Sequence, residues 1–249
     1  MRNLPFALQL YSVRDHMAED MAGTLKRVQE VGYDYVELAG MGGLTPAECK
    51  ALLDDAGLTA VANHFGLDDV TANVDATIEA CSILGMKYAV VPGIDSKLTE
   101  DKAGWLNCAK AMDEGGAKLR SAGIQLCYHN HSHEFRKLDG EFIFDIFFGG
   151  ASPQNLACEI DTYWVKYGGV DPVATIQKYT GRCPLLHIKD MTAGDNPTFA
   201  EVGRGIIDWE PIFDAGAAAG AEWYIVEQDA CEGDSLDSVA ISAEFMAKQ

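Results

Sequence analysis

The sequence predicts an α/β protein, a (β/α)₈ TIM barrel with one extra β-hairpin after the fifth strand. Short runs of β-branched and aromatic residues alternate with amphipathic helical stretches along the whole chain, and eight such runs are present. The length of 249 residues is typical of one such barrel, so we expect a single domain over residues 1–249. An open doubly wound sheet usually has fewer strands, and no GxGxxG motif follows the first run.

Strand and helix patterns follow one another in regular order. Predicted strands cover residues 6–12, 33–38, 59–64, 88–92, 124–130, 156–161, 185–190 and 223–228. Helical patterns include residues 21–31, 46–56, 73–84, 102–122, 172–179 and 209–219. Thr45 and Pro46 are residue types that begin a helix, and Gly57 and Gly85 stand where a left-handed residue ends one. These signals favour parallel strands joined by helices.

One segment interrupts this order. Residues 134–138 and 141–144 flank Asp139 and Gly140, and Asp-Gly between two strand-like runs is a strong hairpin signal. Because the segment follows a strand end, we expect it to lie over the mouth of the barrel. Barrels keep their active sites there, so the hairpin and Glu134 are expected to wall one side of the pocket.

Composition restricts the partners. Thirty-eight acidic and nineteen basic residues give a formal charge of -19, which repels nucleic acid and anionic membrane surfaces. The same charge slightly favours a neutral polyol or keto-sugar over a sugar phosphate as the small-molecule substrate. Apolar runs such as residues 88–92 are far shorter than the ~20 residues of a membrane span. Assembly into a homo-oligomer is left open.

The N-terminal sequence and the cysteines bear on location. Residues 1–10 show no export signal, and the seven cysteines form no CxxC pair. Buried free thiols in a reducing cytoplasm explain them better than disulfides or a zinc ribbon. We therefore expect a cytoplasmic protein.

Three late strands end in residues that bind metal ions. Asp161, His187 and Glu227 each stand at the end of an apolar strand, where side chains face the mouth of a barrel. Carboxylate and imidazole ligands suit one divalent ion: Mn²⁺, Mg²⁺, Co²⁺ or Zn²⁺. The structural alternatives are that Asp161 caps the following turn and that His187 is a hydrogen-bonded core residue.

Lys189 shares a face with His187 because side chains alternate along a strand. It is a candidate for binding a substrate oxygen or stabilising an oxyanion. The alternative is a salt bridge from Lys189 to Asp190 or Glu201.

The fifth strand ends in the densest polar cluster of the chain. Residues 128–134 contain three histidines and one glutamate. His129 and His131 share a face of the strand, while Glu134 could fold back over the mouth. Either His129 or Glu134 is the fourth metal ligand, and either is a candidate proton carrier opposite Glu227.

Further polar residues lie near the ends of the early strands and in a loop after the seventh strand. The candidates for contacting substrate hydroxyls are Gln9, Tyr11, Glu37, His64, His131 and Arg204. The forked guanidinium of Arg204 suits a pair of hydroxyls or a phosphate. Tyr11 has the alternative of being a core aromatic residue.

Together these motifs resemble those of the xylose isomerase-like barrel superfamily of sugar phosphate isomerases and epimerases, over nearly the whole chain. The resemblance implies that a Glu, an Asp, a His and a second Glu hold one divalent ion. The last three correspond to Asp161, His187 and Glu227, whereas His129 stands where relatives have the first glutamate. The motifs that carry it are Leu8-Gln9-Leu10-Tyr11-Ser12, Tyr128-His129-Asn130-His131 with Glu134-Phe135, Glu159-Ile160-Asp161, His187-Ile188-Lys189-Asp190, Gly203-Arg204-Gly205-Ile206-Ile207-Asp208-Trp209 and Val226-Glu227-Gln228-Asp229.

The resemblance implies a metal-dependent isomerase or epimerase of a small sugar. In such enzymes a base removes the proton next to a metal-polarised carbonyl, giving an enediolate, and Glu227 is the expected base. Returning the proton elsewhere isomerises or epimerises the sugar. Expelling a β-hydroxyl instead dehydrates it, as in the inosose dehydratases, which also have a histidine-rich fifth strand. The alternative in which the protein is not an enzyme is a barrel that binds a sugar without catalysis.

Overall fold

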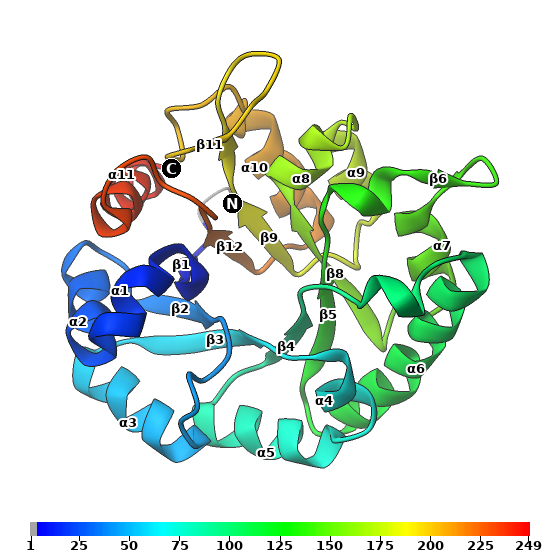
Figure 1. Ribbon diagram of the computed structural model, residues 1–249, viewed down its shortest axis with the longest axis horizontal. Helices are drawn as coiled ribbons and strands as arrows, with labels where there is room; N and C mark the ends of the chain where they lie inside the picture. The colour runs from blue at the N-terminus through cyan, green and yellow to red at the C-terminus, as the bar shows by residue number, and fades with distance from the viewer. Residues whose placement is uncertain (1–3) are drawn as a thin grey trace.

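The computed structural model describes residues 4–249. Residues 1–3, which belong to the segment 1–10 considered as an export signal, lie outside the described residues. Within that range eight parallel strands close into a barrel in the order β1-β12-β9-β8-β5-β4-β3-β2, and helices surround it (Figure 1). The predicted (β/α)₈ architecture is confirmed. The barrel strands are β1 (Phe6–Gln9), β2 (Tyr35–Leu38), β3 (Thr59–His64), β4 (Tyr88–Val91), β5 (Gln125–His129), β8 (Leu156–Asp161), β9 (Leu185–Ile188) and β12 (Trp223–Val226).

Each of the six helical stretches named from the sequence contains a helix. The α-helices are α1 (Arg14–Glu19), α2 (Met21–Glu30), α3 (Pro46–Ala56), α4 (Leu67–Thr71), α5 (Val74–Leu84), α6 (Lys102–Ser121), α7 (Ile143–Gly149), α8 (Thr162–Tyr167), α9 (Pro172–Lys178), α10 (Trp209–Ala219) and α11 (Ser235–Met246). Short 3₁₀ turns are η1 (Leu10–Val13), η2 (Ser96–Leu98) and η3 (Ser132–Phe135).

Helix α3 shows how local sequence sets the helix ends. Thr45 Oγ1 accepts from the N–H of Glu48 at 3.3 Å, and the Glu48 carboxylate accepts from the N–H of Thr45 at 2.9 Å. This capping box satisfies two donors that the first turn leaves unpaired. Gly57 ends the helix at φ 75°, a left-handed conformation that costs glycine little.

Six of the eight predicted strands are shorter in the structure, and two of them end where the chain makes a different contact. The first, residues 6–12, ends at Gln9, because the Gln9 side chain accepts from the N–H of Tyr11 at 3.0 Å and the chain turns into η1. The seventh, residues 185–190, leaves the barrel at Ile188. Its continuation, β10 (Asp190–Met191), pairs antiparallel with β11 (Phe199–Ala200).

The hairpin predicted after the fifth barrel strand is present. Strands β6 (Lys137–Leu138) and β7 (Glu141–Phe142) pair antiparallel, and Asp139 and Gly140 have φ values of 53° and 86°, as the two-residue hairpin turn requires. Figure 1 shows it projecting from the outer edge of the helix ring beside α7. Lys102 Nζ on α6 lies 2.9 Å from Glu141 Oε2, and this ion pair holds the hairpin at the periphery.

The side chains inside the barrel change from apolar to polar along its axis. A small apolar cluster fills one part of it: Ala7, Val61, Ala62, Tyr88, Val90, Cys127, Ala157, Leu185 and Ile225. Because inward-facing positions recur every two residues, the next inward residues toward the strand ends include Gln9, His129, Glu159, His187 and Glu227. Polar side chains are therefore concentrated at the carboxyl ends of the strands.

All seven cysteines are free, and six of them are buried, while Cys231 is partly exposed. Across residues 4–249, none of the helices combines the length and the apolar character that a membrane span requires.

Candidate functional site

A cavity of about 540 Å³ opens at the mouth of the barrel. Its volume falls within the range of small-molecule binding sites. Among its lining residues are five of the side chains singled out from the sequence: Tyr11, His64, His129, His131 and Glu227. Residues 134–144 do not line it, so the prediction that the hairpin walls this pocket is wrong.

His187 lies at the centre of the polar interior and is fully buried. Its Nδ1 lies 2.9 Å from Glu227 Oε2, and its Nε2 lies 2.7 Å from Glu37 Oε2 and 3.3 Å from Glu159 Oε2. Burial opposes the charged imidazole, but the carboxylates of Glu159 and Glu227 raise its pKa well above the usual value. His187 is thus surrounded by carboxylates, unlike an ordinary core histidine.

Asp161 combines the two roles that the sequence left as alternatives. Its Oδ1 accepts from the N–H of Trp164 at 2.8 Å and caps α8. Its Oδ2 is buried without a hydrogen bond, 3.8 Å from His129 Nε2 and 3.3 Å from Lys189 Nζ. Burial raises the pKa of Asp161 to about 6, against the opposing effect of the Lys189 ammonium. One oxygen is structural, and the other faces the site.

Lys189 pairs with carboxylates of the site. Its Nζ lies 2.8 Å from Glu227 Oε2, 2.7 Å from Asp229 Oδ1 and 3.3 Å from Asp161 Oδ2. The alternative of a salt bridge to Asp190 or Glu201 is therefore wrong. Burial alone would raise the pKa of Glu227, but Lys189 and His187 lower it well below the usual value. Glu227 is held as a carboxylate beside an ammonium group.

Four residues, two of them in the cavity wall, are arranged as metal ligands could be. His129, Asp161, His187 and Glu227 each offer one ligand atom, and these atoms lie within 4.8 Å of one another; we name them the mouth group. Asp161 and His187 are brought together because they are register partners on β8 and β9. The carboxylates of Asp161, Glu227 and Asp229 all lie near the single ammonium group of Lys189. In addition, Asp161 Oδ2 has no hydrogen-bond partner among the described residues. A cation fits this donor set and this excess of negative charge.

Glu134 lies outside the mouth group. It is fully buried, and its two oxygens accept from Tyr128 Oη at 2.6 Å and from the N–H of His131 at 2.9 Å. Strand alternation directs Tyr128 toward the helices and His129 toward the barrel axis. Burial raises the pKa of Glu134 to about 7. This carboxyl group connects η3 to β5. The fourth residue of the mouth group is His129 and not Glu134.

Three predicted substrate contacts do not line the cavity. Gln9 and Glu37 are fully buried beneath it, where Gln9 Nε2 donates to Glu37 Oε2 at 2.8 Å. Glu37 also contacts His187, so it supports that ring instead of facing a ligand. Arg204 is exposed on its loop and is absent from the cavity wall.

Sequence reasoning overlooked the role of Glu159. It is fully buried and belongs with His64, His129 and His187 to a second cluster, which we name the floor group. The signal was available, because Glu159 precedes Asp161 by two residues and so shares its face of β8.

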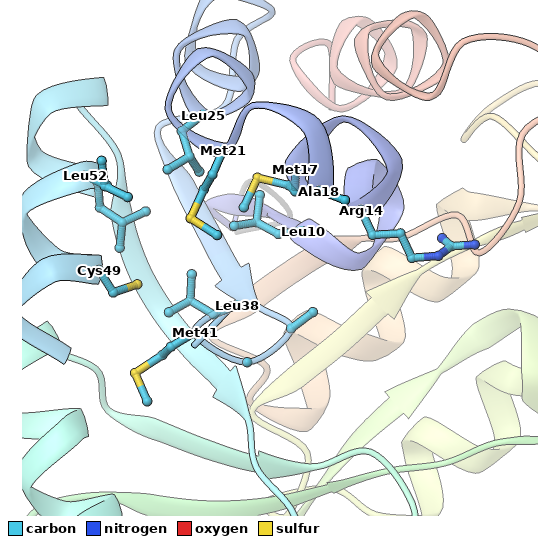
Figure 2. A pocket seen from close by; sticks show the side chains of 14 residues that line it. Leu10, Arg14, Met17, Ala18, Met21, Leu25, Leu38, Met41, Cys49 and Leu52 are labelled. Atoms are coloured by element: carbon cyan, nitrogen blue, oxygen red, sulfur yellow. The ribbon is translucent and has the colours of Figure 1, made fainter. Parts of the chain in front are cut away.

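A second cavity, of about 320 Å³, lies beside the barrel between α2 and α3 (Figure 2). Leucine and methionine side chains dominate its wall, and Figure 2 shows the guanidinium of Arg14 directed away from them. That guanidinium lies 4.1 Å from the centre of the Tyr11 ring and donates to the Tyr11 carbonyl at 2.9 Å. The cavity lacks the convergent polar groups of a catalytic site, whereas the barrel mouth has them.

Comparison with known proteins identifies the family. A family model described as "Xylose isomerase-like TIM barrel" matches residues 25–249. The chain belongs to this family. Among curated relatives, the inosose dehydratase of Geobacillus kaustophilus is 23% identical over 237 residues, covering 80% of this chain and 76% of that protein.

Solved structures show the same fold. A sugar phosphate isomerase/epimerase from Parabacteroides distasonis superposes with a TM-score of 0.85 at 24% identity, covering 98% of this chain and 93% of that one. The probable 3-DHS dehydratase of Bacillus anthracis superposes with a TM-score of 0.75 at 11% identity, covering 98% and 99%. At these identities the two solved structures show that the fold is shared.

Proposed function

We propose that this protein is a divalent-metal-dependent isomerase or epimerase of a small sugar or keto-sugar, acting through an enediolate. The observation that carries the proposal is the pairing of Glu227 with Lys189 at 2.8 Å, with Glu227 in the wall of the mouth cavity. Asp161 Oδ2 lies 3.3 Å from Lys189 Nζ, and His187 Nδ1 lies 2.9 Å from Glu227 Oε2. A carboxylate base and a cation at one point of a sheltered pocket are what abstraction of a proton next to a carbonyl requires.

The mouth group would hold the ion. His129, Asp161, His187 and Glu227 supply two imidazoles and two carboxylates, a donor set that suits Mn²⁺, Mg²⁺, Co²⁺ or Zn²⁺. A bound divalent ion polarises a carbonyl and makes the neighbouring C–H more acidic. Burial and neighbouring positive charge lower the pKa of His129, so its ring is neutral and has a nitrogen available for binding.

Glu227 would move the proton. A bound ion would take the Oε2 side of this carboxylate, where His187 Nδ1 and Lys189 Nζ now lie, which leaves Oε1 to accept a proton from the substrate carbon. Lys189 would stabilise the negative charge that develops on the substrate oxygen. Delivery of a proton to the other face of the carbon by His129, the carrier expected opposite Glu227, would give an epimer. Return of the proton by Glu227 to the adjacent carbon would give the isomer.

The wall of the cavity suits a polyol. Tyr11, His64 and His131 offer a hydroxyl and two imidazoles, and sugar hydroxyls both donate and accept hydrogen bonds. Burial lowers the pKa of His131 to about 4, so its ring is neutral and can accept from a hydroxyl.

Dehydration is the second candidate reaction, and the inosose dehydratase relatives favour it. After Glu227 removes the α-proton, the C–O bond at the β-carbon would break, and the Lys189 ammonium would donate a proton to the departing hydroxide. The products would be one water and an unsaturated ketone. Both reactions share their first step, and they differ in whether water leaves.

The test is proton exchange in deuterated water. Metal-loaded protein is incubated with inososes and keto-sugars, and deuterium at the carbon next to the carbonyl is measured by NMR, with loss of water followed by mass spectrometry. We expect exchange with the true substrate, and Glu227→Gln should slow exchange and turnover by about 10²-fold or more, the scale of losing a general base.

Glu134→Gln is the matched control, because Glu134 is a buried glutamate outside the mouth group. It should retain exchange. Full turnover by Glu227→Gln would show that another group carries the proton. Binding of a sugar without exchange or turnover would favour the non-catalytic sugar-binding barrel.

A further inference from the structure

Four side chains beneath the mouth group converge on one buried point. The floor group comes from four strands, with His64 on β3, His129 on β5, Glu159 on β8 and His187 on β9. Glu159 Oε2 lies 3.3 Å from His129 Nδ1, 3.3 Å from His187 Nε2 and 3.5 Å from His64 Nε2. A single carboxylate oxygen thus has three imidazole nitrogens around it.

These close approaches are ion-pair contacts whose geometry falls short of good hydrogen bonds. Within residues 4–249, both oxygens of Glu159 and Nδ1 of His129 are buried and have no hydrogen-bond partner. A hydrogen bond requires the donor to point at the acceptor, whereas metal ligands all point at a common centre. Ion pairs with His64 and His187 offset part of the cost of burying the Glu159 carboxylate, and a cation bound at this centre would take their place.

The spacing fits a tetrahedral zinc ion. Four nitrogen and oxygen ligands at about 2.0–2.1 Å from tetrahedral Zn²⁺ lie about 3.3–3.4 Å from one another. The three separations from Glu159 Oε2, of 3.3, 3.3 and 3.5 Å, match this value, and all four ligand atoms lie within 4.8 Å of one another. Three imidazoles and one carboxylate are ligands that Zn²⁺ accepts. We propose that the floor group is a zinc site distinct from the mouth group.

The two groups share two rings. His187 directs Nδ1 toward Glu227 and Nε2 toward Glu159. His129 directs Nε2 toward Asp161 and Nδ1 toward Glu159. A neutral imidazole has one nitrogen free to bind a metal, so each ring serves one group at a time. Zinc on the floor therefore withdraws both rings from the mouth group and competes with the ion bound there.

Access and neighbouring contacts are compatible with zinc entry. His64 and His129 line the mouth cavity, so an ion reaches the floor from solvent through it. In the described structure His187 Nε2 contacts Glu37 Oε2 at 2.7 Å. When this nitrogen binds zinc it gives up that contact, and Glu37 keeps the hydrogen bond from Gln9 Nε2 at 2.8 Å.

The experiment titrates metal-free full-length protein with Zn²⁺ against a chromophoric chelator, and it requires no substrate. Glu159→Gln should weaken zinc binding by about 10²-fold or more, since even partners of metal ligands contribute 10–100-fold to affinity. Glu227→Gln removes a mouth ligand and should change the affinity by less than about threefold. Glu244→Gln, at an exposed position on α11, is the isosteric control.

Co²⁺ gives an independent measurement, because four-coordinate Co²⁺ absorbs visible light more strongly than six-coordinate Co²⁺. The strong bands should persist in Glu227→Gln and disappear in Glu159→Gln. His64→Ala, at the partly exposed edge of the group, should lose zinc in the same way and serves if Glu159→Gln does not fold.

Three outcomes would overturn the floor site. Loss of zinc in Glu227→Gln with retention in Glu159→Gln would place the ion at the mouth. Equal loss in both variants would show that no distinct floor site exists, and unchanged affinity in all variants would place zinc elsewhere. Failure of the proposed reaction would leave these titrations unaffected.

Discussion

Glu134 is a buried carboxyl group whose ionisation opposes folding. Burial raises its pKa to about 7 from the ordinary value of 4.5. A raised pKa means that the folded state binds the proton more tightly, so this contribution to stability is full below pH 4.5 and is lost as the pH rises through 7. The shift corresponds to about 3 kcal/mol.

Comparison of Glu134→Gln with wild type isolates this effect, because other groups titrate in both proteins. Glutamine keeps an acceptor for Tyr128 or for the N–H of His131 and cannot ionise. The free energy of unfolding of Glu134→Gln should rise relative to wild type between pH 5 and pH 7.5, as measured by urea denaturation. A difference that does not change with pH would contradict the assignment.

At the scale of elements, Asp190 fixes the loop that follows β11. This aspartate is fully buried. Five donors contact its carboxylate at 2.8–3.1 Å: the backbone N–H groups of Met191, Gly203, Gly205 and Ile207, and Nε1 of Trp209. These bonds hold the backbone of the loop that carries Arg204, although Arg204 itself does not line the cavity.

Asp190→Ala should lower the free energy of unfolding by about 3 kcal/mol or more, because it leaves several buried donors unpaired. Denaturation with urea measures the loss. Asp195→Ala, at an exposed position of the preceding loop, should change stability by less than about 0.5 kcal/mol. Similar effects in the two variants would show that the loop does not depend on the carboxylate.

Gly115 sets the approach of α6 to α4. A Cβ at this position would lie 1.8 Å from the carbonyl oxygen of Val70, so backbone would have to move. Gly115→Ala should destabilise the protein by about 2 kcal/mol or more despite the better helix propensity of alanine. Gly149→Ala on α7 meets nothing within 4 Å and should be neutral or stabilising. Equal melting temperatures for the two variants would contradict this packing argument.

At the scale of the whole molecule, an ion at the mouth group should stabilise the folded barrel. Ligand at about 100 times its Kd contributes about 2.7 kcal/mol, which for a chain of this length raises Tm by roughly 5–10 °C. Mn²⁺ added to metal-free protein should give this shift in a thermal melt, and a chelator should reverse it.

Asp161→Asn should abolish the Mn²⁺ shift while leaving the melt of metal-free protein close to that of wild type. The asparagine side-chain oxygen can still accept from the N–H of Trp164 and cap α8, but it is a weaker metal ligand than the carboxylate. An unchanged Mn²⁺ shift in this variant would place the ion outside the mouth group.

The strand and helix order and the strand ends that carry polar residues were determined by the sequence alone. Their signals are local, since side chains alternate along a strand and residues such as Thr45, Gly57 and Asp139-Gly140 set turns and helix ends within a few positions. The same alternation indicated that Asp161, His187, Lys189 and Glu227 face inward.

Only the tertiary structure decided which polar groups meet and at what depth. Gln9 and Glu37 face inward like Glu227, yet they lie beneath the cavity and contact each other and His187. Glu134 accepts a hydrogen bond from Tyr128 and lies outside the site. Glu159 contacts three imidazoles and lies within it. These outcomes depend on the register between strands far apart in the sequence and on competition among nearby partners. No local pattern encodes either of them, because each distance is set by closure of the whole barrel.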